Sequence, residues 1–218
     1  MTTTSESASQ RKAIIIVAMG DSLTAGYQLM EDEGWVEFAP YTVFLEERLR
    51  DLGQREGLEF RIYNRGGLGE RTDEMLARFD RDVLDLKPDF VIILGGTNDI
   101  GQGFSPDEIF RNLVEMYYAA SKSGIVTIAC SIPSISGCDS LIPPRVALNE
   151  MIRAYCSEKG MSFVDIFRAT GDSRTGRLVD GFSSDGIHLN LSGYKKIADT
   201  VFDEALEKLL LKHISKDK

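Results

Sequence analysis

Five short apolar runs divide the chain. Each is rich in Ile, Val or Phe and ends abruptly at glycine or polar residues, which is typical of strands buried on both faces of a parallel sheet. The expected strands are residues 13–19 (AIIIVAM), 59–63 (EFRIY), 90–95 (FVIILG), 125–131 (IVTIACS) and 162–166 (SFVDI).

Longer stretches between these runs carry apolar residues at helical spacing. Residues 106–122 give the clearest helix, because Ser105 suits the N-cap and Pro106 the first turn. Glu108 completes a capping box with Ser105, and Gly124 follows the helix end. Further helices are expected at residues 41–52, 73–86, 145–159 and 191–212.

The alternation of strands and helices predicts βαβ units with right-handed crossovers. Such units build a parallel sheet with helices on both faces. We therefore expect an α/β fold, a three-layer α/β/α sandwich with a five-stranded parallel sheet. Five strands suit the flavodoxin-like order 2-1-3-4-5.

Length and charge narrow the class of protein. A chain of 218 residues with 43% hydrophobic residues can bury one substantial core but is short for two. We expect one domain over residues 13–218, preceded by a flexible polar tail at residues 1–12. The net charge of −9 argues against binding to nucleic acid or anionic lipid.

Arg11, Lys12 and the apolar run after them have some likeness to a secretory signal. The run has only seven residues, however, and cleavage behind it would remove a predicted strand. No stretch approaches the roughly 18 to 20 apolar residues that cross a bilayer. We expect a cytoplasmic protein without a membrane span. The sequence leaves open whether the protein forms a homo-oligomer.

Cysteine and histidine are few. Cys130, Cys138 and Cys156 form neither a CxxC pair nor a metal-ligand pattern, so reduced structural thiols are expected, with a Cys130 to Cys138 bridge left open. The chain has two histidines, His188 and His213. This number argues against a His-rich metal site. His213 is expected to be solvated and to interact with the end of the last helix.

Four polar or glycine-rich motifs stand where predicted strands end or where the last helix begins. They are GDSLTAG at residues 20–26, NRGGLGERT at 64–72, GGTND at 95–99 and SDGIHL at 184–189. Taken singly, each is an ordinary turn, cap or phosphate-binding loop. Because the carboxyl ends of parallel strands meet at one edge of a sheet, the four are expected to converge there.

The converging residues have the chemistry of acyl transfer. A serine hydroxyl needs an imidazole to accept its proton, and the imidazole needs a group that fixes its tautomer. Ser22, His188 and Asp185 fit these roles. The developing oxyanion needs donors, which the backbone N–H groups of Ser22 and Gly69 and the Asn98 amide can supply.

The motifs GDSLTAG, NRGGLG, GGTND and DGIH, in this order, resemble the blocks of the GDSL family of SGNH hydrolases. The likeness extends from Gly20 to His188. One departure is Gly67-Leu68, where many relatives have a small polar pair. The resemblance implies hydrolysis of carboxylic esters, sometimes thioesters, through an acyl-enzyme and without metal or organic cofactor. It also implies Ser22 as nucleophile, His188 as base, Asp185 as its partner, and Gly69 and Asn98 as oxyanion donors.

Residues 27–41 and 132–144 are the segments that can shape a substrate pocket. Leu29, Met30, Trp35 and Phe38 either form its apolar walls or pack against the first helix. The acidic residues nearby disfavour charged phospholipid or acyl-CoA substrates; they are Glu31, Asp32, Glu33 and Glu37. We expect a small neutral ester with a short acyl chain, such as an acetylated carbohydrate.

Other functions compete with this one. A thioesterase or lysophospholipase of the same fold uses the same residues. A nucleotide-binding enzyme would need a P-loop lysine or a GxGxxG after the first strand, and neither is present. A non-catalytic binding module would have no need of a serine, aspartate and histidine set.

Overall fold

The computed structural model describes residues 13–30 and 35–216 of the chain. The expected tail at residues 1–12 and the acidic residues Glu31, Asp32 and Glu33 lie outside the described residues.

A five-stranded parallel sheet forms the centre of the molecule. Its spatial order is β4-β1-β5-β6-β7, which is the predicted order 2-1-3-4-5 of these strands along the chain. The predicted strands are confirmed to within two residues at almost every end. They are β1 (Ile14–Gly20), β4 (Phe60–Gly66), β5 (Phe90–Leu94), β6 (Val126–Cys130) and β7 (Ser162–Val164).

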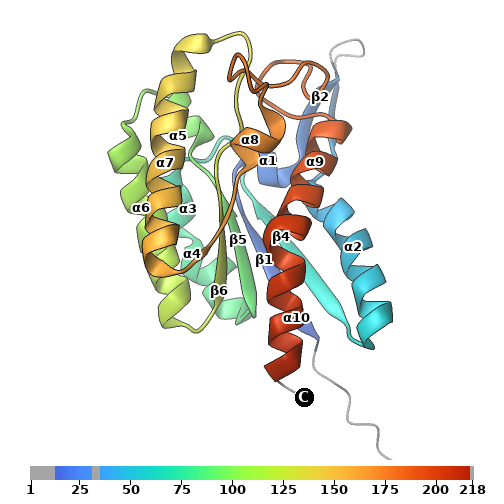
Figure 1. Cartoon of the computed structure of the whole chain (residues 1–218). Helices are drawn as coiled ribbons and strands as arrows, with labels where there is room; N and C mark the ends of the chain where they lie inside the picture. The colour runs from blue at the N-terminus through green and yellow to red at the C-terminus, as the bar shows by residue number, and fades with distance from the viewer. Residues whose placement is uncertain (1–12, 31–34, 217–218) are drawn as a thin grey trace, which may run out of the picture.

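Helices cover both faces of this sheet, which confirms the three-layer architecture (Figure 1). One face carries α2 (Tyr41–Glu56), α9 (Leu191–Val201) and α10 (Glu207–Lys216), and the other carries α3 (Thr72–Ala77), α6 (Pro106–Lys122) and α7 (Ile142–Lys159). The shorter helices are α1 (Ser22–Ala25), α4 (Phe79–Asp82), η1 (Leu84–Leu86), α5 (Thr97–Gly101), η2 (Asp139–Leu141), α8 (Ile166–Thr170) and the π-helical η3 (Phe202–Leu206).

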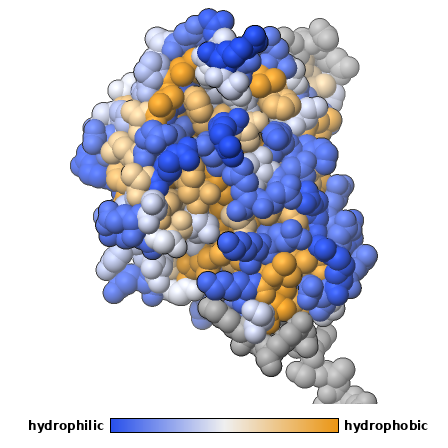
Figure 2. Space-filling view, in the orientation of Figure 1, coloured by the Kyte–Doolittle hydropathy of each residue, from blue (hydrophilic) through white to orange (hydrophobic). Residues whose placement is uncertain are grey.

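The core is a continuous cluster of buried apolar side chains that reaches from Ile14 in β1 to Ile214 in α10. All five residues of β5 are buried, as expected for a central strand covered on both faces. Polar side chains cover much of the face in Figure 2, and apolar residues gather in smaller areas between α7 and the α9–α10 helix. None of the helices in the described part of the chain is long and apolar enough to span a membrane.

The predicted helix at 73–86 is wrong as a single element, because it is broken into α3, α4 and η1. The break falls at Arg78, whose side chain is held by partners elsewhere in the fold. Its Nη2 donates to the carbonyls of Gly20 (3.1 Å) and Arg65 (2.9 Å), and its Nε donates to Glu70 (2.7 Å). These long-range hydrogen bonds override the local helical pattern.

A hairpin between α1 and α2 was not predicted. β2 (Tyr27–Met30) pairs antiparallel with β3 (Trp35–Phe38), with Tyr27 opposite Phe38. Trp35 is 46% exposed and Phe38 54% exposed, so neither is packed away against α1. The hairpin therefore forms a separate feature beside the carboxyl ends of the sheet.

The three cysteines are free in the structure. Cys130 and Cys156 are buried, and burial raises the pKa of both thiols. Cys138 is exposed, and no disulfide joins it to Cys130 in this structure. His213 is less solvated than expected: its ring packs edge-on to Phe90, with centroids 5.4 Å apart.

Two glycines let the turn after β1 press closely against the neighbouring strands. A Cβ at Gly20 would overlap the Thr24 side chain and the Leu94 carbonyl, and a Cβ at Gly66 would overlap the backbone of Ala25. Only glycine fits at such close approaches. The start of α1 is thereby held against the ends of β4 and β5.

Candidate active site

The residues singled out from the sequence lie beyond the carboxyl ends of the strands. Ser22 opens α1 directly after β1, Gly69 follows β4, and Asn98 lies in α5 after β5. His188 and Asp185 come from the segment that precedes α9. The parallel topology thus brings residues from distant parts of the chain to one end of the sheet.

Ser22, His188 and Asp185 form a continuous chain of hydrogen bonds. The Oγ of Ser22 lies 3.2 Å from Nε2 of His188. The Nδ1 of the same ring lies 2.7 Å from Oδ2 of Asp185. This is the geometry in which an imidazole accepts a hydroxyl proton while a carboxylate holds its other nitrogen.

The two carboxylate oxygens of Asp185 have separate partners. Oδ1 accepts the backbone N–H groups of Ile187 (2.8 Å) and His188 (2.7 Å), which leaves Oδ2 for the imidazole. Burial raises the pKa of Asp185, but hydrogen bonds from the His188 ring and from these N–H groups outweigh it and lower the pKa to about 2. The carboxylate is therefore ionised at neutral pH.

The β2–β3 hairpin packs against the histidine. The ring of Tyr27 lies over that of His188, with centroids 4.5 Å apart and planes tilted by 52°. The Oγ of Ser184 donates to the Leu29 carbonyl (2.8 Å), and the Tyr194 hydroxyl donates to the Tyr27 carbonyl (2.6 Å). The two hydrogen bonds hold the hairpin in place, and its Tyr27 ring packs on the imidazole.

Donors for an oxyanion lie at the start of α1 and α5. Ser22 is the first residue of α1, so the helix offers no carbonyl to its N–H. The Nδ2 of Asn98 donates one hydrogen to the Glu70 carbonyl (2.8 Å), and an amide has a second hydrogen to give.

Two positions in the loop after β4 favour glycine for different reasons. Gly69 has a φ of +71°, which favours glycine, and the space around it is open within the described residues. At Gly67, a Cβ would overlap the Glu70 carboxylate, which is paired with Arg78. Leu68 is 55% exposed, so the departure from the usual small polar pair places an apolar side chain at the surface beside Gly69.

A family model for GDSL-like lipases and acylhydrolases matches residues 18–196. The chain belongs to this family. The matched segment of this GDSL-like hydrolase contains each of the motifs described above, from GDSLTAG to DGIH.

Several characterised proteins are similar to this GDSL-like hydrolase. Esterase TesA of Pseudomonas aeruginosa is 26% identical over 197 residues, covering 88% of each chain. An arylesterase of Vibrio mimicus is 25% identical over 219 residues, covering 95% of this chain and 94% of its own. The chain is accordingly a carboxylic ester hydrolase.

The solved structure of Axe2, an acetylxylan esterase from Geobacillus stearothermophilus, has the same fold. It superposes with a TM-score of 0.74 at 20% identity, covering 88% of this chain and 93% of its own. A GDSL-like lipase from Bacteroides thetaiotaomicron superposes with a TM-score of 0.67 at 22% identity, covering 89% and 88%. The fold of the GDSL-like hydrolase is thus that of the SGNH hydrolases.

Sequence reasoning missed Asp21. This residue is fully buried, and its Oδ1 caps α1 by accepting the Leu23 N–H (2.9 Å). Burial and the nearby Asp99 carboxylate raise the pKa of Asp21 to about 7, against the effect of the Leu23 hydrogen bond. An Asp directly before a helix is a common N-cap, so the signal was present in GDSL.

Asp99 was also missed as a support of the site. Its buried carboxylate accepts both the N–H (3.1 Å) and the Oγ1–H (2.6 Å) of Thr72. Asn112 donates to the same Thr72 hydroxyl (3.0 Å). These bonds tie the end of the glycine-rich loop to α5, and so to Asn98.

We predict that Asp21→Asn changes the pH dependence of stability. The folded-state pKa, about 7, lies above the unfolded value of 3.8, so the folded protein holds this proton more tightly. The wild type therefore loses stability from about pH 4 to pH 7, and the variant lacks this loss. Urea unfolding at stepped pH should show a growing stability difference in the variant's favour.

The control for this prediction is Asp51→Asn, at an exposed position on α2. Its stability difference from the wild type should change little over the same pH range. Parallel stability curves for Asp21→Asn and the wild type would contradict the assignment of a raised pKa to Asp21.

We also predict that Asn98→Ala lowers kcat by roughly 10²- to 10³-fold with little change in KM, because the lost donor acts on charge that develops in the transition state. Loss of the Glu70 hydrogen bond should also lower stability by about 1 kcal/mol. The matched control is Asn112→Ala, which should lower stability without the same loss of kcat. A near-normal kcat in a destabilised Asn98→Ala would remove Asn98 from the site.

Proposed function

We propose that this protein is a serine esterase that cleaves small carboxylic esters with short acyl chains, acetylated carbohydrates among them, through an acyl-enzyme on Ser22. The observation that supports the mechanism is the hydrogen-bonded chain from Ser22 Oγ through His188 to Asp185, at 3.2 and 2.7 Å. The substrate class is supported by the surroundings of His188 and by the relatives.

In the first step, the Oγ of Ser22 attacks the carbonyl carbon of the ester while Nε2 of His188 takes its proton. Asp185 holds Nδ1 and stabilises the imidazolium that forms. The pKa of about 2 keeps this carboxylate ionised, so it offers a full negative charge to the ring. The carbonyl oxygen becomes an oxyanion that accepts hydrogen bonds from the Ser22 and Gly69 N–H groups and the Asn98 amide.

Collapse of this intermediate expels the alcohol, which takes the proton from His188. A water molecule then attacks the acyl-enzyme, with His188 acting again as base, and releases the acid. The bonds formed and broken are those of ester hydrolysis alone. No step uses an electron donor or acceptor.

The alcohol side of the substrate is expected to meet aromatic rings. Phe38 lies edge-on to Tyr27 at 6.1 Å, and Tyr27 covers His188 at 4.5 Å. Such rings present flat apolar surfaces, which suit the face of a sugar or an aryl group. Both the acetylxylan esterase and the arylesterase among the similar proteins are named for alcohols of this shape.

The similar Axe2 structures also support the proposed nucleophile and base. Two of them are described as catalytic mutants, in which alanine replaces a serine in one and a histidine in the other. Both superpose on this chain with a TM-score of 0.74.

We predict that Ser22→Ala lowers hydrolysis of p-nitrophenyl acetate by roughly 10³-fold or more and abolishes labelling by a fluorophosphonate probe. Mass spectrometry of the labelled wild type should place the probe on Ser22. Ser121→Ala, exposed on α6, is the control and should retain both activity and labelling. A folded Ser22→Ala that still turns over, or a probe on another serine, would exclude Ser22 as nucleophile.

We further predict a higher kcat/KM for acetyl or butyryl than for palmitoyl esters, measured below their micellar concentrations. Trp35 and Phe38 are each about half exposed, so a long chain along them keeps much of its surface in water. It then gains little of the roughly 0.8 kcal/mol that a buried CH₂ contributes. A kcat/KM that rises with chain length, or no acetate release from acetylated xylo-oligosaccharides, would contradict the proposed substrate class.

A further inference from the structure

Among the residues that the structure describes, the strand β4 forms an open edge of the sheet. It pairs with β1 on one side and is the first strand in the spatial order. The Glu59 carbonyl accepts from Ile14, and the Gly67 N–H donates to Gly20, so odd-numbered residues direct their backbone groups toward β1. Because N–H and C=O of one strand residue point the same way, Phe60, Ile62 and Asn64 direct theirs outward. The Asn64 carbonyl also accepts a long hydrogen bond from Nη1 of Arg65 (3.4 Å).

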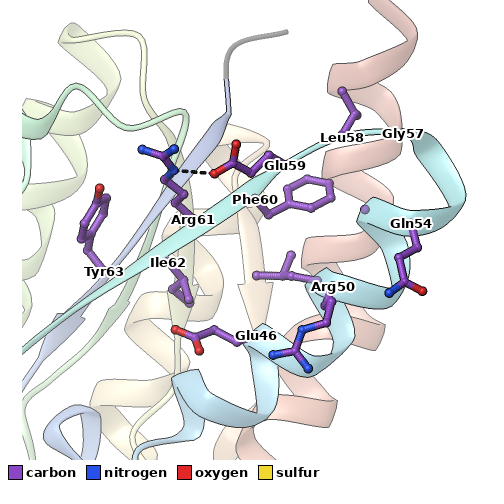
Figure 3. A pocket seen from close by; sticks show the side chains of 12 residues that line it. Glu46, Arg50, Gln54, Gly57, Leu58, Glu59, Phe60, Arg61, Ile62 and Tyr63 are labelled. Atoms are coloured by element: carbon purple, nitrogen blue, oxygen red, sulfur yellow. Dashed lines mark hydrogen bonds and ion pairs between the residues drawn. The ribbon is translucent and has the colours of Figure 1, made fainter. Parts of the chain in front are cut away.

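A groove of about 820 Å³ runs between this edge and α2 (Figure 3). Phe60 and Ile62 extend from the strand toward α2, and Glu46 and Arg50 extend from the helix toward the groove. Outward backbone groups along a groove, here lined by both apolar and charged side chains, are features that admit one more strand.

The side chains on the opposite face of β4 alternate in a charged pattern. Glu59, Arg61, Tyr63 and Arg65 share this face, because strand side chains alternate. Two contacts agree with this: Arg61 donates to Glu59 (2.8 Å), and the Arg65 guanidinium lies over the Tyr63 ring at 5.8 Å. The edge thus carries an acidic residue at its start and basic residues farther along.

We propose that two copies of this chain associate through β4, in antiparallel pairing with Ile62 opposite Ile62 of the second copy. The outward backbone groups of Phe60, Ile62 and Asn64 then complete a ladder across the two-fold axis, joining the two sheets into one. Such a pairing is isologous, as in most homodimers.

Charge favours this register. With Ile62 on the axis, Glu59 faces Arg65 of the second copy, and Arg61 faces Tyr63 of the second copy, each twice. Opposite charges and cation–π contacts directly across a ladder are favourable.

Registers whose axis lies on an odd-numbered residue set like charges against each other. An axis at Arg61 puts that arginine opposite itself, and an axis at Tyr63 puts Arg61 opposite Arg65 of the second copy. An axis between two residues pairs outward backbone groups with inward ones and forms no ladder. An axis at Phe60 also places Glu59 opposite Arg61, but Phe60 is then the one residue of β4 in the ladder. The Ile62 register combines a longer ladder with opposite charges.

The dimer axis lies away from the candidate active site. Ile62 lies in the middle of β4, whereas Ser22 and the loop after Gly66 lie beyond the carboxyl ends of the strands. Each copy keeps its own site, so monomer and dimer should have equal kcat.

The test is the mass in solution over a concentration series, by sedimentation equilibrium of the full chain. The wild type should rise from 24.2 kDa toward twice that mass. Glu59→Arg and Arg65→Glu should each weaken the dimer about tenfold or more, because two pairs become repulsive. The double variant should regain wild-type affinity, and Glu115→Arg, exposed on α6, is the charge-matched control.

A cysteine variant tests the register itself, in a Cys138→Ser background that removes the exposed thiol. Ile62→Cys should form a disulfide between copies under mild oxidation, because paired Cα atoms lie about 5.5 Å apart. Phe60→Cys should not, because its Cα lies about 14 Å from its counterpart at roughly 3.4 Å per residue.

Three outcomes overturn the proposal. A mass that stays at 24.2 kDa at every concentration would leave this edge free for a strand of another protein. A dimer whose affinity is unchanged by the single charge reversals, or not regained in the double variant, uses another surface or register. Equal crosslinking of Ile62→Cys and Phe60→Cys would exclude the Ile62 axis. Equal kcat of the monomeric variants and the wild type is expected.

Discussion

The site depends on how the turn after β1 is capped. The Asp21 carboxyl, buried and with a pKa of about 7, accepts the Leu23 N–H at 2.9 Å and so starts α1 at Ser22. Burial makes this carboxyl costly to ionise, which is why its pKa is raised. The turn can occupy this place only because Gly20 and Gly66 have no side chains to collide with it.

The segment before α9 completes the site, and the two oxygens of one carboxylate in it have different partners. Asp185 uses one oxygen to order its own turn and the other to hold His188. Tyr27 from the β2–β3 hairpin then closes the imidazole from another side. The His188 ring is therefore held by two segments that meet only in the folded chain, which is the preorganisation that a catalytic base needs.

The carboxyl end of the sheet and its β4 edge present different groups. At its carboxyl end lie Ser22, the first residue of α1, and Asn98 in α5, which carry the candidate oxyanion donors. Along β4, backbone groups of Phe60 and Ile62 point outward beside a groove lined by both apolar and charged side chains. The proposed catalysis and the proposed association would thus use separate parts of one sheet.

The sequence by itself determined the five strands, their alternation with helices, and the motifs that contain Ser22, Asn98, Asp185 and His188. These features are local, because apolar runs, caps and glycine turns depend on residues that are neighbours in the sequence. The parallel topology then places the motifs at one edge of the sheet. The helix at 106–122, for instance, has the predicted bounds because its cap and its first turn are encoded within four residues.

Tertiary structure decided what depends on partners far away along the chain. The helix breaks at Arg78 because its side chain donates hydrogen bonds to the carbonyls of Gly20 and Arg65. The pKa of Asp21 is raised because the residue is buried, and its burial cannot be predicted from neighbouring residues in the sequence. The hairpin is short and of mixed composition, so it gave no periodic signal, and its value lies in a contact with His188 more than 150 residues away. Contacts of this kind have no sequence period, because their energy comes from surfaces that become neighbours only on folding.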